Sequence, residues 1–339
     1  MNSDERYMLR AIELARLGKG KTAPNPLVGA VIVYNNHIIG EGYHQFFGGP
    51  HAEVNAIHSV KDQQLLAEST IYVTLEPCSH FGKTPPCSEL ICSKHFKRVV
   101  IGMKDPHSKV AGKGIAQLEL IGIPTTVGVL EKECRELNKG FISFHEKGRP
   151  YILLKWAQTK DGYLDEHGRP IRISGSESDL IVQDLRNEYQ AILVGKQTVI
   201  NDNPRLTCRL ENGTHPIRIV LDSKAQLDPS YNIFNADART IIINTVKKKQ
   251  QGNIEYIKID EMSVPSIIQA LSELNIISVL VEGGQKVLNS FLSAGLWDEA
   301  LIIEGSKNTG GGTAAPLLEM KAQNQKESGE DIIHTYYNR

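Results

Sequence analysis

The stretch GGPHAEVNAIHSV, residues 48–60, places a histidine two positions before a glutamate, directly after a Gly-Gly-Pro turn. The sequence after the turn predicts a helix over residues 52–67. Side chains two positions apart on a helix point in different directions. His51 and Glu53 are therefore poorly placed to hold one metal ion together. A metal at His51 needs ligands from elsewhere in the chain and leaves Glu53 free for another task.

A strand followed by two cysteines supplies suitable ligands. TIYVTLE, residues 70–76, predicts a strand that runs directly into PCSHFGKTPPC, residues 77–87. The carboxyl ends of strands are where α/β sheets place their binding sites. Cys78 and Cys87 follow this strand end. Together with His51 they offer one imidazole and two thiolates, a set that suits Zn²⁺.

The number of protein ligands decides what such a site does. Three ligands leave the fourth zinc position to water, as in catalytic sites, whereas four make a structural site. Zinc lowers the pKa of bound water from roughly 15.7 to about 7, and Glu53 is placed to accept and pass on its proton. His-x-Glu followed by Pro-Cys and another Cys is the signature of zinc deaminases. The alternative is a closed structural site with His44, His80 or Cys92 as fourth ligand.

The first part of the chain predicts one α/β layer structure. A helix over residues 2–18 begins with the capping pair Asn2 and Glu5 and stops at Gly18, and two strands flank an Asn-Asn turn at residues 35 and 36. Alternating helices and strands then predict a sheet of about five strands between helices. The stretch 138–151 interrupts the pattern with glycine, charges and proline. We place the domain boundary there, giving domains 1–146 and 147–339.

The second part starts another alternation and predicts a second α/β domain. No G-x-G-x-x-G follows its first strand, so the Rossmann fingerprint is absent. In LVEGGQKV, residues 280–287, two glycines follow a strand and open a helix, whose free N–H groups attract anions. The polar tail 322–339 gives no prediction. The expected strands cover residues 151–159, 191–195, 217–222, 240–244, 278–284 and 299–305, and the expected helices cover 176–189, 264–275 and 285–296.

Composition excludes several classes of function. The chain has 339 residues, a formal net charge of -1 and five cysteines. This charge offers no broad electrostatic footprint for nucleic acid or an anionic membrane. Five cysteines in a chain of this length do not indicate a disulfide framework. The polar N-terminus lacks a secretion signal and no apolar run spans a membrane, so we expect a cytoplasmic protein.

Beyond these patterns, the chain resembles a known family over nearly its whole length. The eight residues between Cys78 and Cys87, TAPNPLVGAVIV at 22–33 and DPHSKVAGKGI at 105–115 resemble the deaminase half of the bifunctional riboflavin-biosynthesis family. The second half carries three further stretches in the family's order: AILVGKQTVINDNPRLTCR, IRIVLDS and LVEGGQKVLNSFLSAGLWDE. The resemblance implies a cytidine-deaminase-like three-layer domain followed by a dihydrofolate-reductase-like α/β domain.

The resemblance also implies two sequential reactions on one small phosphorylated pyrimidine. The first is zinc-dependent hydrolytic deamination of a diaminohydroxy-phosphoribosylaminopyrimidine, and the second is NADPH-dependent reduction of its ribosyl group to a ribityl chain. One zinc per deaminase domain is held by His51, Cys78 and Cys87, with Glu53 as proton shuttle. Asn25 is a substrate-holding amide or, equally well, a turn residue between two prolines. Expected partners exclude nucleic acid and membranes, and a homo-oligomer is left open.

For the reductase half the resemblance implies a set of contacts, with Asp202 as the residue expected to affect hydride transfer. Arginine forks suit a substrate phosphate because they bind it bidentately. The implied substrate contacts are Arg186, Leu206, Arg209 and Glu282. The implied cofactor contacts are Ala157, Thr198, Asp202, Ser223, Gly284, Gln285, Lys286, Val287, Leu288, Asn289 and Ser290.

The second half also departs from the family pattern in three places. Thr159 and Lys160 replace the usual Ser-Leu before Asp-Gly, GRPIRIS at 168–174 has Arg172 where an aromatic residue is usual, and GSKNTGGGTAAP occupies 305–316. Two alternative functions are a deaminase of a free base, nucleoside or tRNA adenine with an unrelated second domain, and a zinc-stabilised binding module. The near-neutral charge and the long cysteine spacer argue against tRNA.

Overall fold

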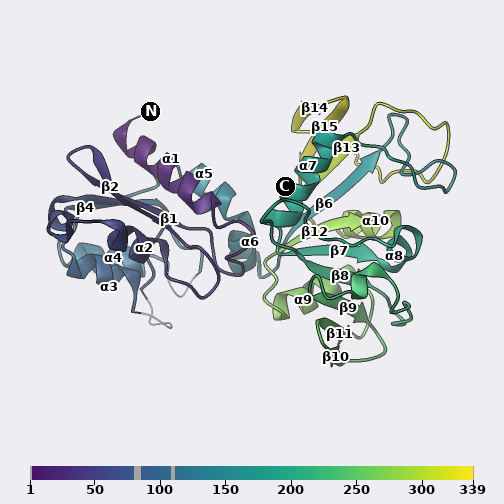
Figure 1. Cartoon of the computed structure of the whole chain (residues 1–339), viewed down its shortest axis with the longest axis horizontal. Coiled ribbons are helices and arrows are strands. Elements are labelled where there is room, and N and C mark those ends of the chain that lie inside the picture. The colour runs from purple at the N-terminus through teal and green to yellow at the C-terminus, as the bar shows by residue number, and fades with distance from the viewer. Residues whose placement is uncertain (1, 80–84, 108–110, 339) are drawn as a thin grey trace. The chain divides into compact units, whose positions relative to one another are not determined.

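The computed structural model describes residues 2–79, 85–107 and 111–338. The chain divides into two compact units, Met1–Gly148 and Arg149–Arg339, each with its own sheet (Figure 1). Within the described parts of the chain, no helix is both long and apolar enough to cross a membrane. The boundary at residue 147 and the roles assigned to the two domains stay predictions.

The first unit is built on a five-stranded sheet of order β2-β1-β3-β4-β5, which confirms the expected sheet of about five strands. β1 pairs antiparallel with β2 and β3, while β3, β4 and β5 run parallel. Asn35 and Asn36 form the predicted turn, with φ values of 46° and 63°. The strands are β1 Gly29–Tyr34, β2 His37–Tyr43, β3 Thr70–Leu75, β4 Arg98–Met103 and β5 Thr125–Val127.

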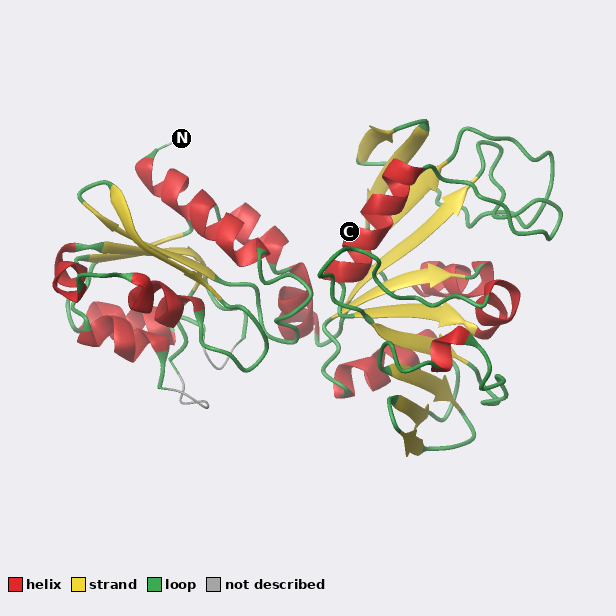
Figure 2. Ribbon diagram, viewed as in Figure 1, coloured by secondary structure: helices red, strands yellow, loops and turns green. Residues whose placement is uncertain are grey.

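Helices cover both faces of this sheet (Figure 2). On one face, α2 (Ala52–Ser59), α3 (Cys87–Ser93) and α4 (Lys113–Leu120) bury an apolar cluster against the strands. α1 (Ser3–Arg16) lies on the other face, and it begins with the predicted capping box. Close packing depends on glycine: a Cβ at Gly42 of β2 would lie 2.2 Å from the backbone nitrogen of Ala56 in α2. This contact fixes the helix that follows His51.

Two predictions about the first unit were wrong. The helix expected over 52–67 ends at Ser59, because Val60 is extended and the Asp62 side chain caps a separate 3₁₀ helix, Gln63–Glu68. The stretch expected to break the pattern instead contains α6, Lys139–Lys147, directly after α5, Glu131–Leu137. α6 buries an apolar side, and Gly148 and Pro150, which follow the helix, mark its end.

The second unit is built on a ten-stranded sheet of order β10-β11-β9-β8-β7-β12-β6-β13-β15-β14. The seven strands from β11 to β13 run parallel, as expected for an α/β domain. The six predicted strands correspond to β6 Tyr151–Gln158, β7 Ala191–Gly195, β8 Ile217–Leu221, β9 Thr240–Asn244, β12 Ser278–Gly283 and β13 Glu299–Glu304. Four strands were not predicted: β10 Lys249–Gln251, β11 Ile254–Lys258, β14 Asn324–Ser328 and β15 Asp331–Tyr337.

Apolar clusters on both faces of the parallel strands explain why these strands read as nearly continuous apolar runs. α9 (Val264–Glu273) and α10 (Gln285–Ala294) pack into one cluster, and α7 (Ser176–Glu188) and α8 (Lys196–Asp202) contribute to the other. A short 3₁₀ helix, Asn232–Phe234, also contributes. Loops at the carboxyl ends of the strands are left to form a site.

Candidate active sites in the two units

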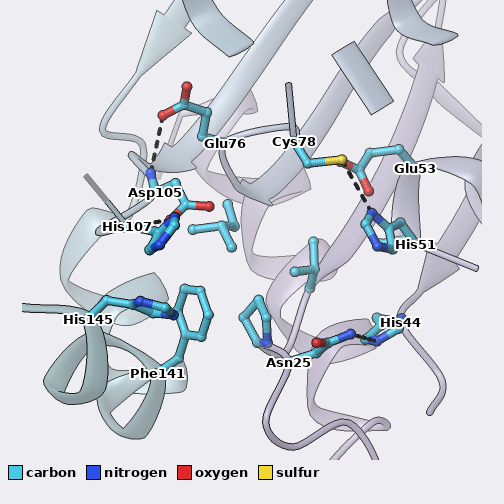
Figure 3. A pocket seen from close by; sticks show the side chains of 14 residues that line it. Asn25, His44, His51, Glu53, Glu76, Cys78, Asp105, His107, Phe141 and His145 are labelled. Atoms are coloured by element: carbon cyan, nitrogen blue, oxygen red, sulfur yellow. Dashed lines mark hydrogen bonds between the residues drawn. The ribbon is translucent and has the colours of Figure 1, made fainter. Parts of the chain in front are cut away.

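Three ligand atoms converge where β3 ends and α2 and α3 begin. His51 is the extended residue before α2, Cys78 follows β3, and Cys87 is the first residue of α3. His51 Nδ1 lies 3.5 Å from Cys78 Sγ and 3.3 Å from Cys87 Sγ, and all three atoms lie within 4.8 Å of one another. Tetrahedral zinc ligands are separated by roughly 3.5 Å. The donor set and its spacing therefore fit Zn²⁺ (Figure 3).

The residues considered as a fourth ligand are otherwise engaged. His44 donates from Nδ1 to the Pro50 carbonyl at 3.0 Å and accepts from the Asn25 amide at Nε2, at 3.1 Å. The Cys92 thiol points to the Gln117 carbonyl, 4.0 Å away. His80 lies outside the described residues. Within the described ranges the ligand group has three members, as a catalytic site requires.

The pKa values of the two thiols shift in opposite directions. A hydrogen bond from the Cys87 thiol and the nearby His51 ring together outweigh burial and lower the pKa of Cys78 to about 4. The same hydrogen bond and burial raise the pKa of Cys87. One thiolate is thus available near neutral pH to begin metal binding, which releases the proton of the second thiol.

Glu53 lies beside this cluster in the first turn of α2 and is only 3% exposed. Burial, with a smaller contribution from the charge of Cys78, raises its pKa to about 7. A carboxyl group with this pKa can both accept and donate a proton near neutral pH. The glutamate that the sequence left without a role as ligand is therefore suited to proton transfer.

A cavity of about 310 Å³ opens from the metal cluster. Apolar side chains form part of its wall, including Val28, Leu75 and Phe141. Figure 3 shows His51, Glu53 and Cys78 on one side of the cavity and His107 and His145 on the other. The cavity therefore has two polar ends separated by apolar surface, a form that suits a flat ring with a polar substituent.

Asn25 and His44 lie along a further side of this cavity. The Asn25 amide is held by His44, so the side chain does more than form the turn between two prolines. Its place in the cavity is compatible with a substrate-holding amide, which stays a prediction.

Glu76 is a buried residue of this site that the sequence analysis missed. Its carboxylate accepts four backbone N–H hydrogen bonds, from Asp105 at 3.2 Å, Gly112 at 3.0 Å, Gly114 at 3.0 Å and Ile115 at 3.4 Å. The loop that brings Asp105 and His107 to the cavity is thus tied to the end of β3, two residues before Cys78. A glutamate closing an apolar strand was the available signal.

The second unit has a cavity of about 690 Å³ at the carboxyl ends of β6, β7, β8 and β12. Gly283 ends β12 with a φ of 109°, and α10 begins after Gly284 without a side-chain cap. The first N–H groups of α10 are therefore available for an anion. Ser223, Asn289 and Ser290 do not line the cavity, whereas the other predicted cofactor residues do: Ala157, Thr198, Asp202, Gly284, Gln285, Lys286, Val287 and Leu288.

Two predicted substrate residues contact each other. Arg186 of α7 donates to both carboxylate oxygens of Glu282, at 3.1 Å and 2.7 Å. Burial raises the pKa of Glu282, but Arg186 and Lys155 outweigh burial and hold it below its usual value. Glu282 lines the cavity and Arg186 does not. The arginine fork is therefore occupied by a protein carboxylate.

The other two predicted substrate residues lie outside the lining of the cavity. Leu206 is buried with a φ of 54°, and Arg209 is exposed while its backbone N–H donates to Gln183 at 2.8 Å. Arg209 still lies near enough to Glu282 to stabilise its charge.

Lys155 of β6 is a second residue that the sequence analysis missed. It lines the cavity, and burial lowers its pKa although Glu282 counteracts this. Its ammonium group forms no hydrogen bond or ion pair with any residue in the described ranges. A single charge within an apolar strand was the signal, because lysine is almost never fully buried without a partner.

Two of the three segments that depart from the family pattern, 168–174 and 305–316, meet at this cavity, whereas Thr159 and Lys160 do not line it. Gly168, Pro170, Ile171 and Thr313 contribute to its lining. Asp165 joins the two segments, because its carboxylate accepts the N–H groups of Gly168 at 2.8 Å and Thr313 at 3.0 Å. Arg172 bonds Asp179 at 2.9 Å. These segments thus keep a structural role with changed side chains.

Together, three converging ligands that fit zinc beside a buried glutamate, and a second domain whose uncapped helix start opens on a large cavity, fit a zinc deaminase joined to a nucleotide-dependent reductase. The model of the family described as "Cytidine and deoxycytidylate deaminase zinc-binding region" matches residues 1–103, and that of the "RibD C-terminal domain" matches residues 150–333. The chain belongs to the RibD family, whose members act in riboflavin biosynthesis with zinc and NADPH.

Relatives and solved structures are similar to this chain over nearly its full length. RibD of Aquifex aeolicus is 38% identical, covering 97% of this chain and 97% of its own. RibD of Bacillus amyloliquefaciens is 44% identical, covering 93% and 87%. The crystal structure of a diaminohydroxyphosphoribosylaminopyrimidine deaminase/5-amino-6-(5-phosphoribosylamino)uracil reductase from Thermotoga maritima matches with a TM-score of 0.93 and 39% identity over 99% of both chains. Acinetobacter baumannii RibD matches with a TM-score of 0.89 and 31% identity, again over 99% of both chains.

Proposed function

We propose that the first unit deaminates a diaminohydroxy-phosphoribosylaminopyrimidine and that the second reduces the ribosyl group of the product with NADPH. The observation that carries this proposal is the buried Glu53 beside a three-ligand zinc site in one cavity. A closed structural site is disfavoured, since His44 and Cys92 lie outside the ligand group. The alternative of an unrelated second domain is excluded by the match of residues 150–333 to the RibD C-terminal domain.

For the deaminase step, His51, Cys78 and Cys87 would hold the zinc ion. A bound zinc ion would supply an acidified water. Glu53 is placed to accept a proton from water and to deliver it to the departing amine, so that the ring carbon exchanges its amino group for a hydroxyl group and ammonia leaves. Asn25, held by His44, orients the ring, and the apolar wall of the cavity excludes bulk water from it.

For the reductase step, the N–H groups at the start of α10 hold the cofactor phosphates, with Thr198 and Ala157 beside them. Glu282, kept ionised by Arg186, would bind substrate hydroxyls. Lys155 would donate to the ring oxygen of the sugar, which becomes a hydroxyl group when the cofactor's hydride adds to the carbon that carried it. Asp202 lies at the end of α8 in the same cavity, where it affects the position of the reacting groups.

The purified chain, supplied with the phosphoribosylaminopyrimidine, tests this function. We expect ammonia release without NADPH, and oxidation of NADPH only after deamination, since the reductase acts on the deaminated product. Ammonia and the absorbance of NADPH are measured separately. The proposed order would be contradicted if a variant that cannot release ammonia oxidised NADPH at the full rate on the aminated substrate.

Replacing Lys155 with methionine is expected to lower the reductase kcat by about 10²-fold, the scale on which loss of one stabilising donor acts in an active site. Methionine fills a similar apolar volume but cannot donate to the sugar oxygen. Turnover is followed with the deaminated substrate supplied directly. Asp202→Asn should also reduce turnover, and full activity of both variants would remove these two residues from the proposed site.

The proposal extends to the location of the protein and to its binding partner. The biosynthetic role of the family supports a cytoplasmic location and a small phosphorylated pyrimidine as the binding partner in place of nucleic acid.

A further inference from the structure

Two loops of the second unit run side by side and form one arm at the reductase cavity (Figure 1). The arm consists of residues 159–171, which follow β6, and residues 307–315, which follow β13. Tyr163 and Ala314 pair as an antiparallel bridge, and backbone hydrogen bonds join the loops on both sides of it. Backbone pairing thus makes one structure from two segments that lie far apart in the sequence.

The arm is held by packing near its base and by hydrogen bonds farther out. Leu164 and Ala315 pack against the apolar cluster that also contains side chains of α10. Beyond this packing, the Asp165 carboxylate accepts the N–H groups of Gly168 at 2.8 Å and Thr313 at 3.0 Å, one from each loop. The outer part of the arm therefore depends on a small number of polar contacts.

The arm forms part of the wall on which the substrate must fit. Pro170, Ile171 and Thr313 of the arm line the same cavity as Lys155 and Glu282, the residues proposed to contact the substrate. A change in the position of the arm therefore changes the space that is left for the sugar.

One side chain connects the arm to the helix start that is proposed to hold the cofactor phosphates. The amide of Gln285, the first residue of α10, donates to the Ala314 carbonyl at 2.8 Å. Among the residues that the structure describes, no other hydrogen bond joins α10 to the arm. Gly284 precedes the helix without a side-chain cap, so the first N–H groups of α10 lack partners in the helix. An anion that accepts these groups stabilises the turn that carries Gln285.

We infer that Gln285 is a positioning residue, through which binding of the cofactor phosphates at the start of α10 fixes the arm and shapes the substrate side of the cavity. This inference rests on the proposed reductase function. Cofactor and substrate then strengthen each other's binding, because both stabilise the same arrangement of the arm, and such coupling is equal in the two directions.

Hydrogen exchange of backbone amides in the full chain, followed by mass spectrometry, tests this connection. Saturating NADP⁺ should slow exchange in the peptides that contain Gly168 and Thr313 about fivefold, the scale on which one hydrogen bond stabilises a structure. Gln285→Met fills a similar volume but cannot donate to Ala314, so it should remove this slowing in the arm. The first turn of α10 should still be protected by NADP⁺ in Q285M, because its backbone N–H groups remain.

Asp165 offers a second way to break the same connection. Asp165→Ala removes the acceptor for Gly168 and Thr313 and should also abolish the slowing by NADP⁺, whereas D165N keeps an oxygen at this place and should retain most of it. Gln197→Met is the matched control, since Gln197 lines the same cavity but its amide donates to Asn201 in its own helix. It should leave the effect of NADP⁺ on the arm unchanged.

The coupling itself is measured as the Kd of NADP⁺ with and without the deaminated substrate, which the oxidised cofactor cannot reduce. We expect the substrate to lower the Kd of the native chain about fivefold, within the usual range of coupling between two sites, and to leave that of Q285M nearly unchanged. Without substrate, the two proteins should bind NADP⁺ about equally, a result that a general loss of structure would not give.

The inference is overturned if NADP⁺ protects the start of α10 but not the arm of the native chain, or if it protects the arm of Q285M equally. It is also overturned if the substrate lowers the Kd by the same factor in both proteins. Failure of NADP⁺ to protect the start of α10 in the native chain would instead contradict the proposed function of the second unit.

Discussion

Glu53→Gln is expected to reduce ammonia release by about 10³-fold, because general acid–base groups contribute on the order of 10²–10⁴-fold and this one serves two proton transfers. Glutamine keeps the size of the side chain and the first turn of α2 but cannot accept a proton. The metal ligands are untouched, so the variant should still contain one zinc per chain. Ammonia release under saturating substrate and zinc content by elemental analysis together test this prediction.

The pH dependence of the native enzyme is a second test of the role of Glu53. Glu53 must be ionised to accept a proton, so kcat/KM should rise with pH through its pKa, which burial raises to about 7. A bound cation lowers this pKa, which places the midpoint at or below pH 7. A profile that stays flat down to the lowest pH at which zinc is retained, or an active E53Q variant, would assign the proton transfer to another group.

The second large effect concerns the thiol ligands. Cys78→Ser and Cys87→Ser should each lose nearly all bound zinc and reduce deamination at least 10³-fold, because a hydroxyl is a far poorer ligand than a thiolate. The first unit should also unfold at a lower temperature, since metal binding contributes to the stability of the fold that holds it. Zinc content, ammonia release and thermal unfolding are the measurements.

The second unit has its own sheet and core, so it should be spared. Reduction of the deaminated substrate, supplied directly, should stay within twofold of the native rate in both serine variants. Cys92→Ser is the matched control, because Cys92 lies on the same helix as Cys87 but outside the ligand group. Full zinc content in C78S, or zinc loss in C92S, would show that the ligand assignment is wrong.

The metal site was predictable because its parts have short-range signals. His51 stands before a helix, Cys78 follows a strand, and the carboxyl ends of strands in such a sheet lie together. The pairing of Arg186 with Glu282 had no such signal, since the two residues are 96 positions apart and arginine reads as a phosphate ligand in isolation. Lys155 was detectable from local sequence, but its cavity was not.

The missed secondary structure has a similar explanation. α6 is only nine residues long and contains a glycine near its start, and its buried Phe141 and Ile142 become meaningful only when the sheet is present. β15 carries no regular apolar pattern, because Asp331 is buried while Ile332 is exposed and the next residues after Ile333 are half-buried, and its partner β13 lies about 30 residues earlier. Tertiary pairing, and not local propensity, creates such strands.

The carboxylate of Glu76 has a consequence for how enzymes of this kind diverge. It fixes four N–H groups between residues 105 and 115 and stands two positions before a metal ligand. Insertions or deletions in that segment would displace the zinc-binding strand end together with the loop. New substrate preferences should therefore arise by exchange of side chains at constant segment length, and natural length variation should be concentrated elsewhere in the domain.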